Sequence, residues 1–382
     1  MKLIHLSDLH IGMRLREFSL LEDQSYILTE ILGIVQREAP DGVILAGDLY
    51  DRADPSAEAV ALLDRFLSGL CELKVPVFAI SGNHDSPERI AFGSSIMRGS
   101  GVYLSPVYDG TLPPVTLTAG DCTADLYLMP FVKPAHVRRF FPDREIGSYT
   151  EAIAAALEGL PVNPEHRNIL VCHQFVTGAA RSDSEQITVG GTDNVDASVF
   201  SGFDYVALGH IHRPQNVGSD TIRYCGTPLK YSFSEAKQEK SVTVVEFGAQ
   251  GPVTTRTIPL HPLRDMRELR GSYDQLTDRR NYQGTPVEDY LHITLTDEED
   301  VPDVMARLRV IYPNVMLLSY DNRRTRSQEV LSANPDMEER SPLEQAKAFY
   351  IERNGGPMSP QQEEILRTLM EKIWDDERED RT

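Results

Sequence analysis

The sequence VILAGDLYD, at Val43–Asp51, leads from a short hydrophobic run directly into a glycine and two acidic residues. The run Val43–Ala46 has the length and the branched side chains of a buried strand. Asp48 and Asp51 follow it at once. Taken alone, Gly47-Asp48 is typical of an ordinary turn, so its meaning depends on whether the same arrangement recurs elsewhere in the chain.

The arrangement recurs at four other places. Each time a hydrophobic run ends at Asp, Asn or His residues: Lys2–Leu6 before Asp8-Leu9-His10, Val77–Ile80 before Gly82-Asn83-His84-Asp85, Ile169–Cys172 before His173, and Tyr205–Leu208 before Gly209-His210-Ile211-His212. In open α/β sheets, ligands bind outside the carboxyl ends of the strands. Each motif alone is compatible with a loop or a turn, but packing does not explain all five together. The sequence therefore predicts five strands that deliver polar side chains to one edge of a sheet.

These side chains are predicted to bind metal ions. Carboxylate, amide and imidazole groups together suit Mn²⁺ or Fe²⁺ and tolerate Zn²⁺. Asp8 and His10 are two residues apart, as are His210 and His212, so each pair would point the same way from an extended segment. Asp48 could bridge two cations with its two oxygens. Two metals roughly 3.5–4 Å apart can clamp a phosphoryl centre and activate a bridging water, so the sequence predicts a two-metal hydrolase of phosphate esters.

His84 is the predicted catalytic residue outside the ligand set. It neighbours Asn83 but is expected to project away from the metals, where it would stabilise the transition state or protonate the leaving oxygen. Asp51 or Asp85 would orient its imidazole. The predicted metal ligands are Asp8, His10, Asp48, Asn83, His173, His210 and His212.

Composition limits the partners and the compartment. The chain has 38 Lys and Arg against 58 Asp and Glu, a formal charge of −20, which argues against a general nucleic-acid binder because phosphate contacts need basic residues. It does not exclude a nuclease, since metal ions and a partner subunit can supply positive charge. The sequence contains no apolar run of about 18 residues or more, and a strand begins at the N-terminus without a signal peptide. The four cysteines lack CxxC spacing, which favours a cytoplasmic protein over a disulfide framework or a structural zinc site.

The periodic segments indicate an α/β sandwich of two sheets with helices outside. Helical spacing over Leu20–Arg37 and Ala57–Leu70 alternates with the strands, and Pro55 fits a first helical turn. After Ile211 the pattern becomes hairpin-like, with Ile222–Cys225 followed by Ser241–Phe247.

The C-terminal third has a different composition. Residues 264–288 are polar and poorly patterned, and a small βαβ-like module follows, with Tyr290–Leu295, Val301–Ile311 and Val315–Tyr320 as its elements. A polar stretch then precedes two amphipathic helices. The predicted divisions are a catalytic domain over 1–260, a small α+β domain over 261–325, a linker over 326–341 and a helical segment over 342–376.

The five motifs resemble, in order, those of the calcineurin-like metallophosphoesterase family: D-x-H, G-D-x-x-D, G-N-H-[DE], H and G-H-x-H. The resemblance implies a metallophosphoesterase sandwich of two mixed sheets flanked by helices, with His84 as the catalytic histidine. It also implies two sets of ligands that share Asp48, namely Asp8, His10, Asp48 and His212 for one ion and Asp48, Asn83, His173 and His210 for the other.

Nearly the whole chain resembles the SbcD family, the nuclease subunits of bacterial SbcCD complexes. The supporting stretches are Ser182–Glu185, Asp204–Gln215 and Arg223–Lys240, and Cys225-Gly226-Thr227 departs from an expected Ser-Gly-Ser without touching a predicted ligand. In this resemblance, 261–325 is similar to a capping domain, and the terminal helix pair is similar to the segment that docks on the coiled-coil base of the SbcC ATPase. The chain has no G-x-x-x-x-G-K-[ST] motif, so any nucleotide hydrolysis must come from another subunit.

The resemblance implies a DNA nuclease that uses two divalent metal ions, with Mn²⁺ expected. Such enzymes act as 3′→5′ exonucleases on double-stranded ends and as endonucleases on single strands and hairpins, in recombination, replication and the processing of palindromes. The expected assembly is a homodimer that forms a heterotetramer with an SbcC-type ATPase. Two alternatives stay open. One is a small-molecule phosphodiesterase or phosphatase, although Ala53 breaks the G-D-x-x-D-R-G pattern of protein phosphatases. The other is a binding subunit without turnover, against which the complete ligand set argues.

The predicted contact residues form three sets, each with a plainer alternative. Arg14, Arg16, Arg52 and Arg89, together with Arg138 and Arg139, could meet DNA phosphates or could be ordinary solvated charges. The dimer candidates, which could equally be core, are Leu62, Phe66, Ile90, Phe92 and Ile96. The ATPase-binding candidates, which could instead pack on their own domain, are Leu343, Phe349, Tyr350, Leu366 and Leu369.

Overall fold

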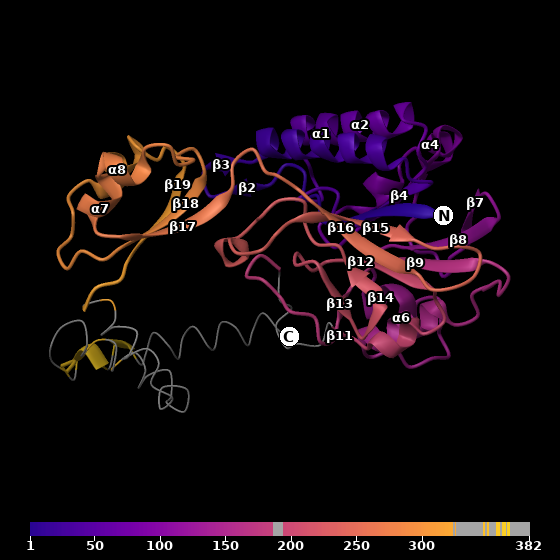
Figure 1. The fold of residues 1–382 in the computed structure, drawn as a ribbon. Helices are drawn as coiled ribbons and strands as arrows, with labels where there is room; N and C mark the ends of the chain where they lie inside the picture. Colours follow the sequence, from indigo (N-terminus) through magenta and orange to yellow (C-terminus); the bar gives the residue numbers. More distant parts are fainter. Residues whose placement is uncertain are drawn as a thin grey trace. The chain divides into compact units, whose positions relative to one another are not determined.

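The computed structural model describes residues 1–185 and 194–323, together with residues 325, 347, 350, 357–359, 361–363 and 365–366. A first compact unit contains Met1–Thr294 and Pro302–Ser319, and the other described residues belong to a second unit. The first unit, whose helices and strands are labelled in Figure 1, contains all the residues of the site described below.

Two six-stranded mixed sheets form the centre of the first unit. The order across the first sheet is β16 (Thr254–Pro259), β15 (Ser241–Glu246), β1 (Lys2–Leu6), β4 (Gly42–Ala46), β5 (Val77–Ile80) and β6 (Val102–Leu104). The order across the second sheet is β13 (Gln215–Val217), β14 (Ser219–Tyr224), β12 (Tyr205–Gly209), β9 (Arg167–His173), β8 (Cys122–Met129) and β7 (Val115–Ala119). In each sheet four neighbouring strands are parallel. Antiparallel pairing adds β15 and β16 at one edge of the first sheet, and β13 and β7 at the two edges of the second. The predicted sandwich of two mixed sheets is confirmed.

The two sheets enclose an apolar core between their inner faces. Ile44 and Phe78 of the first sheet belong to the same buried cluster as Ile169 and Val171 of the second. Alternate residues of β4 face the other way, where Val43 and Leu45 pack in a second cluster with the helices. Because β4 and β9 are buried on both faces, they appear in the sequence as unbroken hydrophobic runs.

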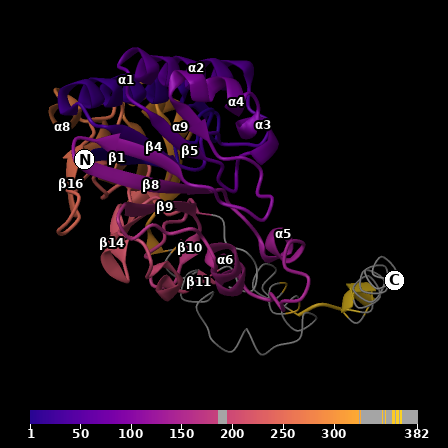
Figure 2. The same ribbon diagram turned by 90° about the vertical axis from the view of Figure 1, so that its right-hand side faces the viewer.

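Helices cover both outer faces of the sandwich, as Figures 1 and 2 show. α1 (Leu21–Glu38) and α2 (Ala57–Glu72) pack on the first sheet, while α5 (Pro134–Arg138) and α6 (Tyr149–Leu157) pack on the second. Both long helices were predicted. α2 begins after Ser56, whose side chain accepts a hydrogen bond from the Ala59 amide, so Pro55 precedes the cap and does not lie in the first turn.

The strands after Ile211 do form antiparallel pairs of consecutive strands, β13 with β14 and β15 with β16, but Ile222–Cys225 and Ser241–Phe247 do not pair with each other. β14 pairs with β12 and β13 in the second sheet, whereas β15 pairs with β1 and β16 in the first. The chain crosses from one sheet to the other between Tyr224 and Ser241. Strand periodicity fixes which face of a strand is buried but does not determine its neighbour, and this crossing brings residues 225–240 over the site.

A three-stranded module follows the sandwich. Its sheet order is β17 (Met266–Gly271), β18 (Tyr290–Leu295) and β19 (Val315–Tyr320), and its helices are α7 (Tyr273–Thr277), α8 (Arg279–Tyr282) and α9 (Val304–Arg309). The prediction of a βαβ-like unit missed β17 and the two short helices, because residues 264–288 are polar and β17 has no regular alternation of buried and exposed residues. Tyr290 donates a hydrogen bond to Asp23 Oδ2 of α1 at 2.8 Å, which ties the module to the sandwich within the first unit.

The remaining elements are short. They are the strands β2 (Arg14–Leu15), β3 (Phe18–Ser19), β10 (Phe175–Val176) and β11 (Asn194–Val195), the helices α3 (Pro87–Ala91) and α4 (Ser94–Met97), and the 3₁₀ helices η1 (Arg98–Ser100), η2 (Ala197–Phe200) and η3 (Phe233–Glu235). Among the described residues, no helix has the length and apolarity needed to span a bilayer.

Candidate metal centre

The five predicted strands end at one edge of the sandwich, and their polar side chains converge there. The loop after β1 stays paired with the loop after β4, since the Asp8 amide donates to the Gly47 carbonyl and the His10 amide donates to the Asp48 carbonyl, both at 3.0 Å. Asp8, His10 and Asp48 have φ values of 53°, 43° and 49°, and His210 has 103°. The segments are therefore not extended as predicted. Left-handed backbone at four candidate ligands is strained, and the surrounding pairing holds it in place.

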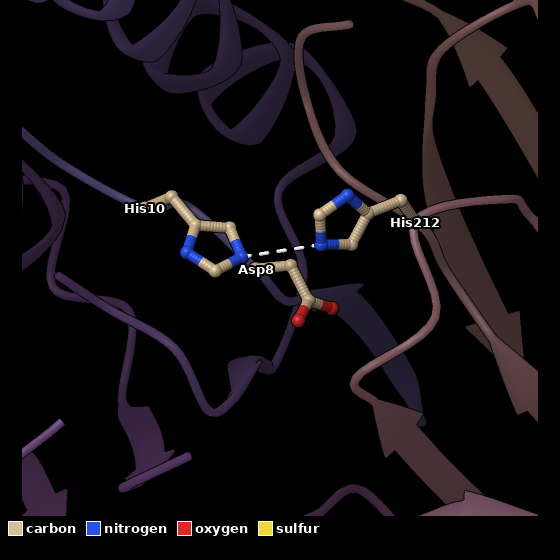
Figure 3. Close-up of side chains that lie close together, drawn as sticks. All are labelled: Asp8, His10 and His212. Atoms are coloured by element: carbon tan, nitrogen blue, oxygen red, sulfur yellow. Dashed lines mark hydrogen bonds between the residues drawn. The ribbon is translucent and has the colours of Figure 1, made fainter. Parts of the chain in front are cut away.

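Asp8, His10 and His212 form what we call the first ligand group. Their ligand atoms lie within 4.8 Å of one another. The Nε2 atoms of His10 and His212 are 3.2 Å apart, and the Asp8 carboxylate lies beside both rings (Figure 3). All three side chains are buried, so neither ring is turned out to solvent. One carboxylate and two imidazole nitrogens at this spacing match the ligands that a divalent transition metal takes.

Asn83, His173 and His210 form the second ligand group. Asn83 Oδ1 lies 3.0 Å from His173 Nε2 and 2.9 Å from His210 Nδ1. His173 Nδ1 lies 2.8 Å from the carbonyl oxygen of Ala46. Because a carbonyl only accepts, this contact places the proton of a neutral His173 on Nδ1 and leaves a lone pair on Nε2. The group thus presents an amide oxygen and imidazole nitrogens to one point.

Asp48 lies between the two groups. Its Oδ2 atom is 3.7 Å from His10 Nε2 and 3.4 Å from His173 Nε2. Its Oδ1 atom accepts a hydrogen bond from the His84 amide at 2.8 Å, which fixes the carboxylate's orientation. Asp48 is buried, and its carboxylate approaches an imidazole of each group. Asp8 of the first group also comes within 4.8 Å of the ligand atoms of Asp48 and His173.

The protonation chemistry of the cluster fits a divalent cation. Burial holds the pKa of His10 well below its ordinary value and lowers that of His210 to about 3, so both rings are neutral with free lone pairs. Burial opposes ionisation of Asp48, but the adjacent His173 outweighs it and holds the Asp48 pKa below its usual range. For His173 burial likewise acts against the charged form, and Asp48 overcomes it and raises the pKa to about 9. A cation between these residues would take the place of the His173 proton in neutralising Asp48.

His84 stands beside the cluster, and its partner differs in part from the one predicted. Its Nδ1 lies 2.8 Å from the main-chain carbonyl of Asp51, and its ring centroid is 4.8 Å from that of His10. The Asp51 residue therefore orients the imidazole, but through its backbone, since its carboxylate faces Arg52.

The Asp85 carboxylate does not orient His84, contrary to expectation. It accepts hydrogen bonds from the amides of Leu49, Tyr50 and Gly82 at 2.9–3.0 Å. Burial, followed by the nearby Asp48, raises its pKa to about 6. Asp85 thus links the loop after β4 to the loop after β5, the two loops that contain Asp48 and Asn83.

Several residues that contact the His212 ring were given no function by the sequence analysis. Its ring Nδ1 lies 2.8 Å from Ser184 Oγ and 3.4 Å from Glu235 Oε1. Cys225 also proves less remote than expected, because its Sγ atom is 3.0 Å from Ser7 Oγ, which in turn donates to the Asp8 carboxylate. Glu235 and Lys240 are buried within a polar segment whose Ser234, Lys237 and Glu239 are exposed, so the sequence did not distinguish them from the solvated charges around them.

Comparison with known proteins places the chain in a family. Residues 1–214 match the family described as calcineurin-like phosphoesterase, and residues 262–354 match the type 5 capsule protein repressor C-terminal domain. The chain is 36% identical over 323 residues to the SbcD subunit of the nuclease SbcCD from Staphylococcus epidermidis, covering 84% of this chain and 85% of that protein. It is 38% identical to the SbcD subunit of the nuclease SbcCD from Staphylococcus saprophyticus, covering 84% of each.

The chain belongs to the SbcD family of calcineurin-like phosphoesterases. Among solved structures it is similar to a dimetal phosphatase from Danio rerio, at 12% identity and a TM-score of 0.38, over 67% of this chain and 98% of that one. The resemblance inferred from the motifs is confirmed.

The predicted DNA contacts of this SbcD-family chain lie at the surface. Arg14, Arg16 and Arg52 are exposed. Arg89 is also exposed and pairs with Asp54. Exposure is compatible with binding to DNA phosphates but also with ordinary solvated charges, so these contacts stay a prediction.

The predicted dimer contacts divide into two kinds. Leu62, Phe66 and Ile90 are at most 6% exposed and pack in the core against the first sheet, so they are not surface contacts. Phe92 and Ile96 are 84% and 83% exposed. The helical periodicity of α2 identified its apolar face correctly, and in the folded chain α1 and the sheet cover that face.

The ATPase-binding candidates fall largely outside the described residues, which is the case for Leu343, Phe349 and Leu369, as for the linker over 326–341. Tyr350 accepts a hydrogen bond from Gln362 at 3.0 Å, and Lys347 pairs with Glu363. Leu366 is partly buried. These contacts join residues 347 and 350 to residues 362 and 363.

Proposed function

We propose that the chain is a metal-dependent DNA nuclease subunit that cleaves phosphodiester bonds at a centre of two divalent ions. The observation that carries this proposal is the position of Asp48, which approaches both ligand groups with His84 beside it. The first ligand group would hold one ion and the second group the other, with Asp48 shared. Mn²⁺ is the proposed metal, because the donor set is rich in imidazole and carboxylate and has no thiolate.

The roles of the side chains follow from their contacts. When bound, divalent ions polarise phosphoryl oxygens and lower the pKa of a water nucleophile. The ligand groups would fix where the ions bind and thereby where the scissile phosphate is held. His84 keeps a proton on Nδ1, because its partner there is the Asp51 carbonyl, so it exchanges protons through Nε2. An Nε2 proton is positioned to stabilise charge on the phosphoryl group or to reach the leaving oxygen.

Family membership supports DNA as the substrate and an SbcC-type ATPase as the partner. The proposed activities are 3′→5′ exonuclease on double-stranded ends and endonuclease on single strands and hairpins, in DNA recombination, replication and end processing. The net charge of −20 means that a partner would supply much of the positive surface that holds DNA. Exposed Phe92 and Ile96 support a homodimer through α3 and α4, which with the ATPase would form a heterotetramer.

Cleavage assays on two classes of substrate test the activity. Supercoiled plasmid and hairpin DNA, incubated with the chain, its ATPase partner and Mn²⁺, should be cut, while a chelator should stop the reaction. Small phosphodiesters such as bis-p-nitrophenyl phosphate serve as the comparison. Efficient hydrolysis of the small substrate with no cleavage of DNA, even with the ATPase present, would contradict the proposal and favour a small-molecule phosphodiesterase.

Co-purification tests the partner. A chain that ends near residue 335 should keep its nuclease chemistry on single-stranded DNA but lose the ATPase, because the terminal helix pair is the proposed docking segment. The full-length chain is the control. Retention of the ATPase by the shortened chain would contradict this role.

A further inference from the structure

The ring of His212 is held by a chain of side-chain hydrogen bonds that ends in a buried ion pair. Ser184 Oγ lies 2.8 Å from His212 Nδ1 and donates to Glu235 Oε1, while Glu235 Oε2 lies 2.6 Å from Lys240 Nζ. Glu235 is completely buried and Lys240 is 5% exposed. A buried ion pair contributes little stability relative to an apolar pair of the same volume, so its presence here calls for another role.

The direction of these hydrogen bonds can be determined by counting protons. Glu235 is paired with Lys240 and also accepts from the Tyr231 amide, so it is an ionised carboxylate that only accepts. Ser184 has one hydroxyl proton, which it donates to Glu235, and its oxygen must therefore accept from His212 Nδ1. The proton of a neutral His212 is therefore on Nδ1, which leaves the lone pair on Nε2, the atom that faces His10 and Asp8.

Lys240 and two further residues also hold the main chain of His212. Lys240 donates to the His212 carbonyl at 2.9 Å, and the Thr227 amide donates to it at 3.1 Å. The His212 amide donates to Glu185 Oε1 at 2.8 Å. Lys240 donates its third hydrogen bond to Gln238 at 2.9 Å, so all three of its protons are used. The ring, the amide and the carbonyl of one candidate ligand are thus held together.

The other imidazole of the first ligand group has no comparable support. Among the described residues, His10 Nδ1 is a buried nitrogen without a hydrogen-bond partner. The geometry of this group therefore depends on Asp8 and on the position of the His212 ring.

We infer that Ser184, Glu235 and Lys240 are positioning residues that set the affinity of the first ligand group for its metal ion by fixing the tautomer and the orientation of His212. This inference rests on the proposed two-ion function and deepens it. Partners of this kind raise the basicity of a metal-bound imidazole and hold its plane, and their loss typically weakens metal binding by about 10- to 100-fold. The second ligand group, whose His173 is held by a main-chain carbonyl, should not depend on them.

Titration calorimetry of the full-length, metal-free chain with MnCl₂ tests the inference. Ser184→Ala should weaken one of the two Mn²⁺ affinities by about 10- to 100-fold and leave the other unchanged. Ser184→Thr keeps the hydroxyl and should restore the lost affinity. Electron paramagnetic resonance gives an independent measurement, because at two equivalents of Mn²⁺ the variant should show more of the isolated-ion signal and less of the coupled-pair signal than the wild-type chain.

The role of the ion pair is tested by changing both of its residues together. Glu235→Gln alone leaves Lys240 buried without its counter-charge and can unfold the chain. The double variant Glu235→Gln with Lys240→Met removes both charges and should recover stability while still binding the first ion about 10- to 100-fold more weakly. Asp125→Asn is the matched control. It removes another buried carboxylate, paired with His166 at 2.9 Å, and should leave both affinities unchanged.

Two results would overturn the inference while leaving the function intact. They are unchanged Mn²⁺ affinities in Ser184→Ala and in the double variant, or an equal loss at both sites. A wild-type chain that binds no Mn²⁺ would instead overturn the two-ion function itself.

Discussion

The two ligand groups of the centre are held in different ways. The second group depends on the main chain and on the ends of buried strands, since His173 closes β9 and bonds to the Ala46 carbonyl of β4. Positive φ occurs in both groups, at Asp8 and His10 of the first and at His210 of the second, but the first group depends in addition on a side-chain network that reaches Glu235 and Lys240. A main-chain hydrogen bond survives most substitutions, whereas a side-chain network can be lost through one. The first group should therefore be the more sensitive to changes at a distance from the metals.

The largest expected effect comes from Asp48, the residue that the two groups share. Asp48→Ala should lower the binding of both ions together and abolish DNA cleavage, because neither group keeps its full set of ligands. Elemental analysis after dialysis and a plasmid cleavage assay measure the two losses. Asp54→Ala, an exposed carboxylate on the following loop, is the control. Normal metal content in Asp48→Ala would show that the groups share no ligand.

His84 should separate chemistry from metal binding. His84→Ala should reduce DNA cleavage by about 10²- to 10⁴-fold, the range that a positioned proton donor supplies. Its metal content should stay normal, since the contact with Asp48 is made by the backbone amide. Cleavage at the wild-type rate would remove His84 from the mechanism, and a loss of metal would make it a ligand.

His210 and His212 test the difference between the groups from a single loop. His210→Ala should weaken the ion of the second group and His212→Ala that of the first, each by at least the roughly 10- to 100-fold that outer-sphere changes cause. Anomalous diffraction from crystals soaked in Mn²⁺ would show which position loses its peak. Loss of the same peak in both variants would show that His210 and His212 bind the same ion, which would contradict the division into two ligand groups.

The smallest effect concerns a buried contact between the two sheets. His5 of β1 contacts the Tyr205 hydroxyl of β12 at 3.0 Å, and burial, followed by the charge of Arg223, lowers the His5 pKa from 6.5 to about 3. The unfolded chain therefore binds the proton more readily, and stability is lost as the pH falls below about 6.5. From pH 7 to pH 5 this loss is about 2 kcal/mol. Urea unfolding of His5→Gln should show a correspondingly smaller decrease, and an identical decrease in the two proteins would exclude His5 as the cause.

Most of the site residues could be predicted from local sequence patterns. The features that were missed all depend on contacts between segments that are distant in the sequence. The strands, the order of the motifs and the side chains that meet could be predicted, because strand periodicity and donor chemistry are properties of neighbouring residues. The left-handed backbone at Asp8 and His10 could not be predicted, since it is imposed by pairing with the loop after β4. Asp85 was assigned to His84 on proximity in sequence, yet its carboxylate accepts from the Leu49 and Tyr50 amides of the loop after β4 and from the Gly82 amide of its own loop.

The sequence by itself determined the class of chemistry. Five hydrophobic runs, each followed by metal-binding residue types, specify a metallophosphoesterase before the conformation of any loop is known. Only the tertiary structure decided how these residues are supported. It buried Leu62 and Phe66 under α1, carried the chain from β14 in one sheet to β15 in the other, and so placed Glu235 and Lys240 behind His212. Contacts of this kind depend on which distant segments the closing of the sandwich brings together, and no local pattern encodes that.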